Sequence, residues 1–178
     1  EFANVGTYLT NFIWNDFCSW YIEMSKLSLL NDEIADNTRQ VLVYVLKNIM
    51  VLLHPFVPFV TDEIYQAIPG NVGSIHKEVW PNIPESYLND ETTSAMDSII
   101  EVITIVRNVR NTENIANSIK LKIAVYDKSE DNRLVKSFND NMDYLTKFTN
   151  AEEFIVSTEK NFGENGRVVA ISDGELFV

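Results

Sequence analysis

The stretch Leu52–Gln66 reads LLHPFVPFVTDEIYQ, and it contains a signal that ends a helix. Pro55 has no backbone N–H group, and its ring clashes with the preceding turn of a helix. We therefore expect the long apolar segment before it to end as a helix near Leu53 or His54.

The same stretch contains signals that begin a second helix. We expect Pro58 to keep residues 56–59 extended and Thr61 to act as the N-cap. Asp62 and Glu63 then fall in the first turn, where the helix dipole favours acidic side chains. Because apolar residues lie on both sides of this corner, it fixes the angle between two helices and predicts a helical bundle.

Longer helices are predicted on both sides of the corner. Apolar residues recur at helical spacing over residues 3–29, 38–53 and 89–111, with a short helix over 62–68 between them. Asn89 is a suitable N-cap for the last of these helices. The first helix begins at the start of the chain, a pattern that we interpret as typical of a piece of a longer protein.

After Asn114 the apolar residues change from the period of a helix to that of a strand. Residues 119–125 alternate as in a strand with one solvated face, and Leu134 to Phe148 has the spacing of one amphipathic helix. Short strands are predicted over residues 154–156, 168–171 and 176–178, with glycines at the turns, namely Gly163, Gly166 and Gly174. We therefore predict two domains, a helical bundle over residues 1–114 and a small α+β domain over residues 115–178.

The composition is that of an acidic globular protein. Of the 178 residues, 46% are hydrophobic and 22% are charged, and the net charge is −12. Residues 1–114 hold 6 basic and 15 acidic side chains, and residues 115–178 hold 8 and 11. Since proteins that bind nucleic acid through general electrostatics are usually basic, we expect any RNA to bind at local sites.

Cysteine usage and hydropathy predict a cytoplasmic protein without membrane contact. The single cysteine, Cys18, excludes an internal disulfide and a cysteine-based zinc cluster, and is typical of a reducing compartment. Residues 41–60 form the most apolar window, but Lys47, Asn48, His54 and two prolines interrupt it. This window is too broken for a transmembrane helix.

A second informative stretch lies at Trp14–Lys26, which reads WNDFCSWYIEMSK. It is followed in order by the corner at Leu52–Gln66, by Trp80-Pro81 and by IVRNVR at residues 105–110. Together these segments resemble the anticodon-binding helical domain of class Ia aminoacyl-tRNA synthetases. The run DFCSWYIE favours the valyl-tRNA synthetases over the leucyl and isoleucyl relatives, which share the HPF corner.

The resemblance implies a mainly α fold, in which a class Ia anticodon-binding helical bundle is followed by a small α+β subdomain. It implies that this chain is the tRNA-binding portion of a ligase that attaches valine to its tRNA using ATP and Mg²⁺. The expected partners are the anticodon stem-loop of a valine-specific tRNA and the remaining synthetase domains in cis, with no DNA. A preceding helix and a following coiled coil of the anticodon region are expected outside this chain.

The aromatic residues of the second stretch are candidates for base stacking. Phe17 and Trp20 lie on the apolar stripe and are expected in the core, whereas Trp14 lies off the stripe and is the best stacking candidate. Asp16 either accepts hydrogen bonds from base amino groups or pairs with an arginine of the bundle, Arg107 or Arg110. Trp80 is expected to lie against the bundle.

The basic candidates for RNA contact are few. Arg107 and Arg110 lie three residues apart on one helical face, where they could clamp a phosphate or simply complement the helix dipole. Lys120 and Lys122 share one face of the predicted strand and could extend a small basic patch. Lys26 is a weaker candidate.

We expect neither a catalytic nor a metal site in this chain. The sequence around Lys26 resembles the ATP-binding KMSKS loop only partly, since its first lysine is absent and it lies in a helical pattern. His54 and His76 have no neighbours at metal-ligand spacing. An acidic helical module that binds a protein partner remains the alternative from a different functional class.

Overall fold

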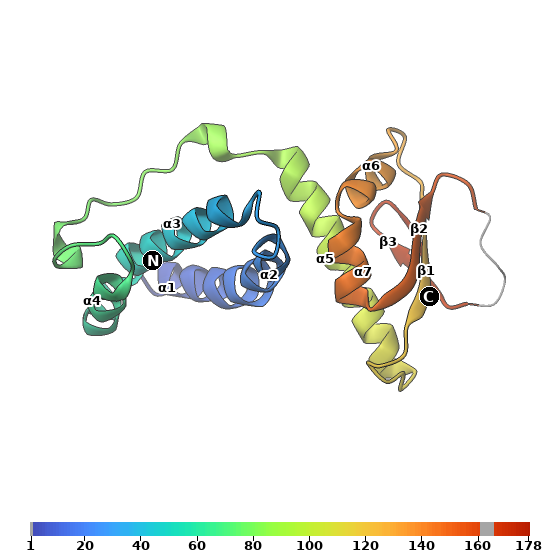
Figure 1. Cartoon of the computed structure of the whole chain (residues 1–178), viewed down its shortest axis with the longest axis horizontal. Helices are drawn as coiled ribbons and strands as arrows, with labels where there is room; N and C mark the ends of the chain where they lie inside the picture. The colour runs from blue at the N-terminus through green and yellow to red at the C-terminus, as the bar shows by residue number, and fades with distance from the viewer. Residues whose placement is uncertain (1, 161–165) are drawn as a thin grey trace. The chain divides into compact units, whose positions relative to one another are not determined.

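A computed structural model of the chain describes residues 2–160 and 166–178 (Figure 1). Gly163, which was expected at a turn, lies outside the described residues. The predicted mainly α fold with a small α+β part is confirmed. The chain divides into two compact units, Glu1–Pro84 and Glu85–Val178.

The first unit is built from a long helix, a turn and a second long helix that runs back along the first. The chain runs continuously through α1 (Phe2–Asn11), η1 (Phe12–Ile22) and α2 (Glu23–Ser28), and α3 (Ala35–Leu53) returns along it (Figure 1). The single helix predicted over residues 3–29 is thus present, but its central part η1 is a π-helix. The spacing of apolar residues did not predict the π-helix. Its wider turns still place apolar residues on the inner side of the helix, and the spacing differs only slightly from that of an α-helix.

The corner between α3 and the next helix differs from its prediction, because the helix begins earlier: residues 58 and 59 are helical rather than extended, and Asp62 and Glu63 lie beyond the first turn. Helix α3 ends at Leu53 as expected, but α4 (Pro58–Ala67) begins with Pro58 at its first turn and has Val57 as its N-cap. Proline suits this position because its fixed φ is already helical and its missing N–H needs no partner there. Thr61 is therefore inside the helix, where its buried hydroxyl donates to the carbonyl of Val57 at 2.9 Å.

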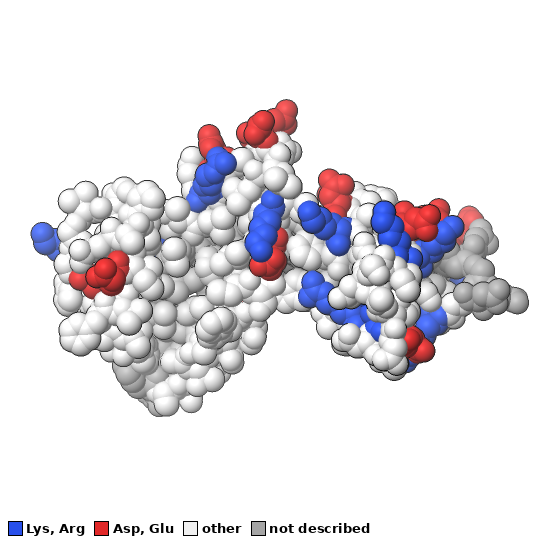
Figure 2. All heavy atoms as spheres, turned by 60° about the horizontal axis from the view of Figure 1, so that its bottom comes forward, with Lys and Arg blue, Asp and Glu red and all other residues white. Residues whose placement is uncertain are grey.

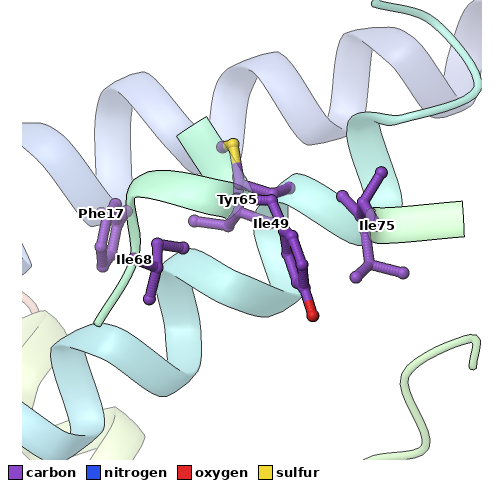
Figure 3. Packing of buried hydrophobic residues seen from close by; sticks show 7 residues of the cluster. Phe17, Ile49, Tyr65, Ile68 and Ile75 are labelled. Atoms are coloured by element: carbon purple, nitrogen blue, oxygen red, sulfur yellow. The ribbon is translucent and has the colours of Figure 1, made fainter. Parts of the chain in front are cut away.

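The core of the first unit lies where these helices meet. Figure 3 shows aromatic and aliphatic side chains from η1, α3, α4 and the 3₁₀ turn η2 (Ile75–Lys77) converging. The labelled members of this cluster are Phe17, Ile49, Tyr65, Ile68 and Ile75. Trp80 does not join them, since its side chain is 62% exposed, and the expectation that it lies against the bundle was wrong.

The second unit begins with a 3₁₀ turn, η3 (Glu85–Tyr87), and the long helix α5 (Asp90–Thr112). Asn89 caps α5 as predicted, because its side-chain oxygen accepts a hydrogen bond from the N–H of Thr92 at 2.9 Å. The inner face of α5 holds fully buried aliphatic side chains, Ile99, Val102, Ile103 and Val106.

A four-stranded sheet completes this unit, in the order β2-β1-β4-β3. Its strands are β1 (Leu121–Asp127), β2 (Ala151–Ser157), β3 (Val168–Ile171) and β4 (Gly174–Phe177). β1 pairs with β2 in parallel and with β4 in antiparallel orientation, and β3 pairs antiparallel with β4. β1 overlaps the alternating segment predicted over residues 119–125 but extends two residues beyond it, and the other strands overlap the three short segments predicted later in the chain.

Two helices connect the parallel strands, where the sequence predicted one. They are α6 (Arg133–Asp140) and α7 (Met142–Thr149), separated at Asn141, whose φ and ψ are −124° and 25°. Both segments bury the predicted apolar stripe, including Leu134, Phe138 and Leu145. A break of one residue preserves such a stripe, so spacing alone could not reveal it.

The compact units divide the chain elsewhere than the two predicted domains. In this division α5 belongs with the sheet, because it contacts α6, α7 and β3. The domain boundary between residues 114 and 115 stays a prediction from the sequence.

Gly174 offers a test of the sheet. A Cβ atom there would lie 2.1 Å from the carbonyl oxygen of Tyr126, so Gly174→Ala must separate β4 from β1. We expect chemical denaturation to show a loss of unfolding free energy of about 2 kcal/mol or more. Gly6→Ala is the matched control, since its Cβ meets only the Phe56 ring at an ordinary 3.4 Å. Equal stability of the two variants would contradict this pairing.

Candidate RNA-binding surfaces

The first candidate surface lies on the π-helix η1. The indole of Trp14 is 65% exposed, while Phe17, three residues on, is 5% exposed and belongs to the core. The Phe17 ring stacks on the Tyr21 ring of the same helix, with ring centroids 6.0 Å apart. The predicted difference between Trp14 and Phe17 is thus present, and Trp14 is an exposed aromatic side chain on the π-helix η1. Trp20 is only half-buried.

Two polar candidates lie on the same long helix. Asp16 is exposed, next to Phe17 in sequence. Lys26 forms an ion pair with Glu23, whose carboxylate lies 2.6 Å from the Lys26 ammonium. Both side chains are well exposed, so the pair is a weak, solvent-screened one, and Lys26 can exchange it for another anion at little cost.

Arg110 in α5 is a structural residue. Its side chain is 5% exposed, and its two terminal nitrogens donate to four backbone carbonyls. The acceptors are Ala116 at 3.2 Å, Ile119 at 2.9 Å, Thr149 at 3.0 Å and Asn150 at 3.3 Å. For Arg110, the predicted role in a phosphate clamp and the predicted ion pair with Asp16 were therefore wrong. Its guanidinium N–H groups already donate to backbone carbonyls.

Arg107 differs from Arg110 although it lies only one turn earlier. Its side chain is exposed and lines a pocket of about 370 Å³, whose wall also includes Asn111, Asn117 and Phe148. Sequence spacing placed both arginines on one face, but it could not show that the chain after α5 folds over one of them. Arg107 keeps its predicted role as a candidate RNA contact.

The two lysines at the start of the sheet are both exposed. Lys122 is in β1, where its ammonium lies 3.6 Å from the carboxylate of Glu153 on β2. Lys120 precedes the strand, next to Ile119, whose carbonyl binds Arg110. Arg107 and Lys120 thus belong to the same unit, and Trp14, Asp16 and Lys26 belong to the other one.

Acidic side chains offset much of the positive charge. Most of the lysines and arginines that the structure describes form an ion pair. Figure 2 shows one face of the molecule, on which basic side chains over the second unit lie beside acidic ones. Neither unit therefore offers a broad basic surface of the kind that neutralises many phosphates.

Two polar contacts near the helix corner were not predicted as important. The Tyr65 hydroxyl donates to Glu78, which also pairs with Lys47 at 2.9 Å. The carboxylate raises the pKa of Tyr65 to about 12, and the Tyr65 and Lys47 donors lower the pKa of Glu78. These contacts join α3, α4 and the loop after η2, and no local pattern links residues so far apart.

Asp62 fixes the same loop to α4. One carboxylate oxygen accepts from the backbone N–H of Ile75 at 2.9 Å and from the Ser74 hydroxyl at 3.0 Å, and the other from Gln66 at 2.8 Å. The Ile75 hydrogen bond is the main cause that lowers the pKa of Asp62 below its ordinary value. The sequence predicted Asp62 to complement the helix dipole, whereas its structural role is to hold the loop.

Within the described ranges 2–160 and 166–178 the side chains form no group of three or more potential metal ligands. His54 and His76 lie side by side, with their Nε2 atoms 3.3 Å apart. No helix in the described part of the chain is long and apolar enough to cross a membrane.

The sequence matches a known protein family. Residues 1–125 match the model of a family described as the anticodon-binding domain of tRNA ligase. Valine–tRNA ligase of Staphylococcus carnosus (strain TM300) is 36% identical over 180 residues, and that of Listeria monocytogenes serovar 1/2a is 38% identical over 180 residues. Each alignment covers 100% of this chain and 20% of the relative, so the chain spans about a fifth of these proteins.

Replacement of Arg110 tests its structural role. Arg110→Met keeps most of the side-chain volume but removes the four hydrogen bonds that the guanidinium donates to backbone carbonyls. We expect the unfolding free energy, measured in urea, to fall by about 3 kcal/mol or more. Arg107→Met is the control and should change it by less than about 0.5 kcal/mol, because the side chain is exposed. Similar losses in both variants would contradict the distinction.

The lowered pKa of Asp62 predicts a pH dependence of stability. Because the pKa lies below 3.8 in the folded chain, the stabilisation is fully present above that value and is lost as the pH falls through the lowered pKa. We expect Asp62→Asn to be less stable than the wild type at neutral pH, with the difference shrinking in acid. Urea titrations from neutral pH to about pH 3 measure this difference.

The control for this experiment is Glu63→Gln, since the Glu63 side chain is exposed. It should follow the wild type across the whole range. A difference between Asp62→Asn and the wild type that stayed constant into acid would refute a stabilising role of the ionised carboxylate.

Proposed function

Because the chain belongs to the family of anticodon-binding domains of tRNA ligases, we propose that it binds the anticodon stem-loop of a valine-specific tRNA. It does so as the non-catalytic part of a valine–tRNA ligase. The observation that carries the proposal is the family match over residues 1–125. The relatives that extend the similarity over the whole chain are valine–tRNA ligases, which supports the choice of amino acid.

The reaction itself is assigned to the remainder of the ligase. We propose that the whole enzyme attaches valine to its tRNA in the cytoplasm, using ATP and Mg²⁺. The role of this chain is to hold the tRNA while other domains act in cis.

Base stacking fits the structure better than broad phosphate neutralisation. Sequence-specific RNA recognition uses unpaired bases that stack on aromatic side chains, and an anticodon loop offers such bases. Trp14 is an exposed aromatic side chain on a helix whose other side is buried. Because the net charge is −12 and most cations form ion pairs, we propose few phosphate contacts and a shallow dependence of affinity on salt.

Trp14→Ala tests this proposal. Loss of one stacked base costs about 1–3 kcal/mol, so we expect the dissociation constant for valine tRNA to rise roughly tenfold or more. Fluorescence anisotropy with labelled tRNA measures the change. Trp80→Ala is the matched control, because Trp80 is a similarly exposed tryptophan in the same unit. Equal losses in the two variants would argue against a specific role of Trp14.

The choice of tRNA separates the alternatives. Binding that weakens when the valine anticodon is changed supports anticodon reading, and equal binding to both forms overturns it. Tighter binding of isoleucine or leucine tRNA would assign the chain to a sister ligase. Absence of binding to any tRNA would favour the acidic module that binds a protein partner.

A further inference from the structure

The pocket beside Arg107 has the size and lining of a small-ligand site. Its volume of about 370 Å³ falls in the range of small-molecule pockets, which starts at about 300 Å³. All of its lining residues belong to the second unit, from the end of α5, the segment before β1 and the end of α7. Arg107 is a candidate RNA contact, but the proposed function does not explain this cavity.

The polar groups in the inner part of the pocket already form hydrogen bonds within the protein. Arg110 lines it, and its guanidinium donates to the carbonyls that follow α5 and end α7. Thr149 also lines it, and its hydroxyl donates to the carbonyl of Leu145 at 2.6 Å. These groups have little left to offer a ligand, so selectivity must come from the other side chains.

Those other side chains are two amides and an aromatic ring. Among the described residues, the side chains of Asn111 and Asn117 have no hydrogen-bond partner, and each offers both a donor and an acceptor. Phe148 is half-buried and contributes an aromatic side chain to the wall. An amide can form two hydrogen bonds with the edge of a base, and a ring can stack on its face.

The helix ends at the pocket disfavour an anion deep inside it. The C-terminal ends of α5 and α7 both contribute to it, and helix C-termini repel negative charge. Cations lie instead at positions that suit the backbone of a polynucleotide. Arg107 lines the pocket, Lys147 precedes Phe148, and Lys120 follows Ile119, with both lysines exposed.

We propose that this pocket takes one unstacked nucleobase of a single-stranded RNA segment. The base stacks against Phe148, and the amides of Asn111 and Asn117 bind its edge, while Arg107 and the two lysines face the flanking phosphates. The inference rests on the proposed tRNA-binding function and adds a site for a base to it.

Binding of single nucleotides is the first test. The whole chain is titrated with each of the four nucleoside 5′-monophosphates while NMR follows the side-chain amide signals of asparagine. We expect saturable shifts of the Asn111 and Asn117 signals at millimolar concentrations for at least one nucleotide, as for a single stacked and hydrogen-bonded base. No saturable shift of these signals with any of the four overturns the proposal.

Variants in tRNA binding provide the second test. The double change Asn111→Ala and Asn117→Ala removes both amides from exposed positions and should leave the fold intact. We expect it to raise the dissociation constant for tRNA roughly tenfold. Asn108→Ala is the control, since this exposed asparagine lies on α5 outside the pocket lining.

The two tests separate this inference from the proposed function. If the wild type binds tRNA and the double variant binds equally well, the base pocket is refuted and tRNA binding stands. If the wild type binds no tRNA, the proposed function fails, and the nucleotide titration alone then decides whether the pocket accepts a base.

Discussion

The carbonyl oxygens at the ends of α5 and α7 have no partners within their own helices, and the guanidinium of Arg110 supplies donors to the end of α7 and to the chain that follows α5. This arrangement fixes the chain between α5 and β1 and brings it against the end of α7. The register of β1 with β2 and the wall of the pocket beside Arg107 both depend on that segment. A charge that looked available for RNA is thus the element that organises the second unit.

Much of the fold could be predicted because it follows from local rules. Proline chemistry located the end of α3, the side-chain oxygen of Asn89 located the start of α5, and alternation located β1. Two predictions were wrong: Thr61 was expected to cap α4 but lies inside it, and one helix was expected where Asn141 separates α6 from α7. In both cases the alternative structure buries the same apolar side chains, so the spacing of apolar residues could not distinguish the two. The burial of Arg110 could not be predicted, since its carbonyl partners Thr149 and Asn150 lie far away in sequence.

The candidate site divides in the same way. Exposure of Trp14 follows from the helical stripe, so sequence alone separated it from Phe17. The pocket lined by Asn111, Asn117 and Phe148 has no motif, because three segments contribute to it. An acidic chain whose cations are mostly paired gains little from non-specific attraction to RNA. Selectivity among RNAs must then come from contacts with bases, and an excess of acidic residues helps by suppressing binding to unrelated RNA.

The π-helix η1 has a consequence for how the sequence can change. α1, η1 and α2 form one continuous helix, and π-helical turns contain more residues than α-helical turns. Removing one residue between Phe12 and Ile22 lets a wide turn close into an ordinary one, whereas in an α-helix it rotates everything beyond it by about 100°. This segment therefore has a capacity to absorb single-residue deletions that α3 and α5 lack. Length variation in this helix bundle should accumulate there and leave the register of its neighbours unchanged.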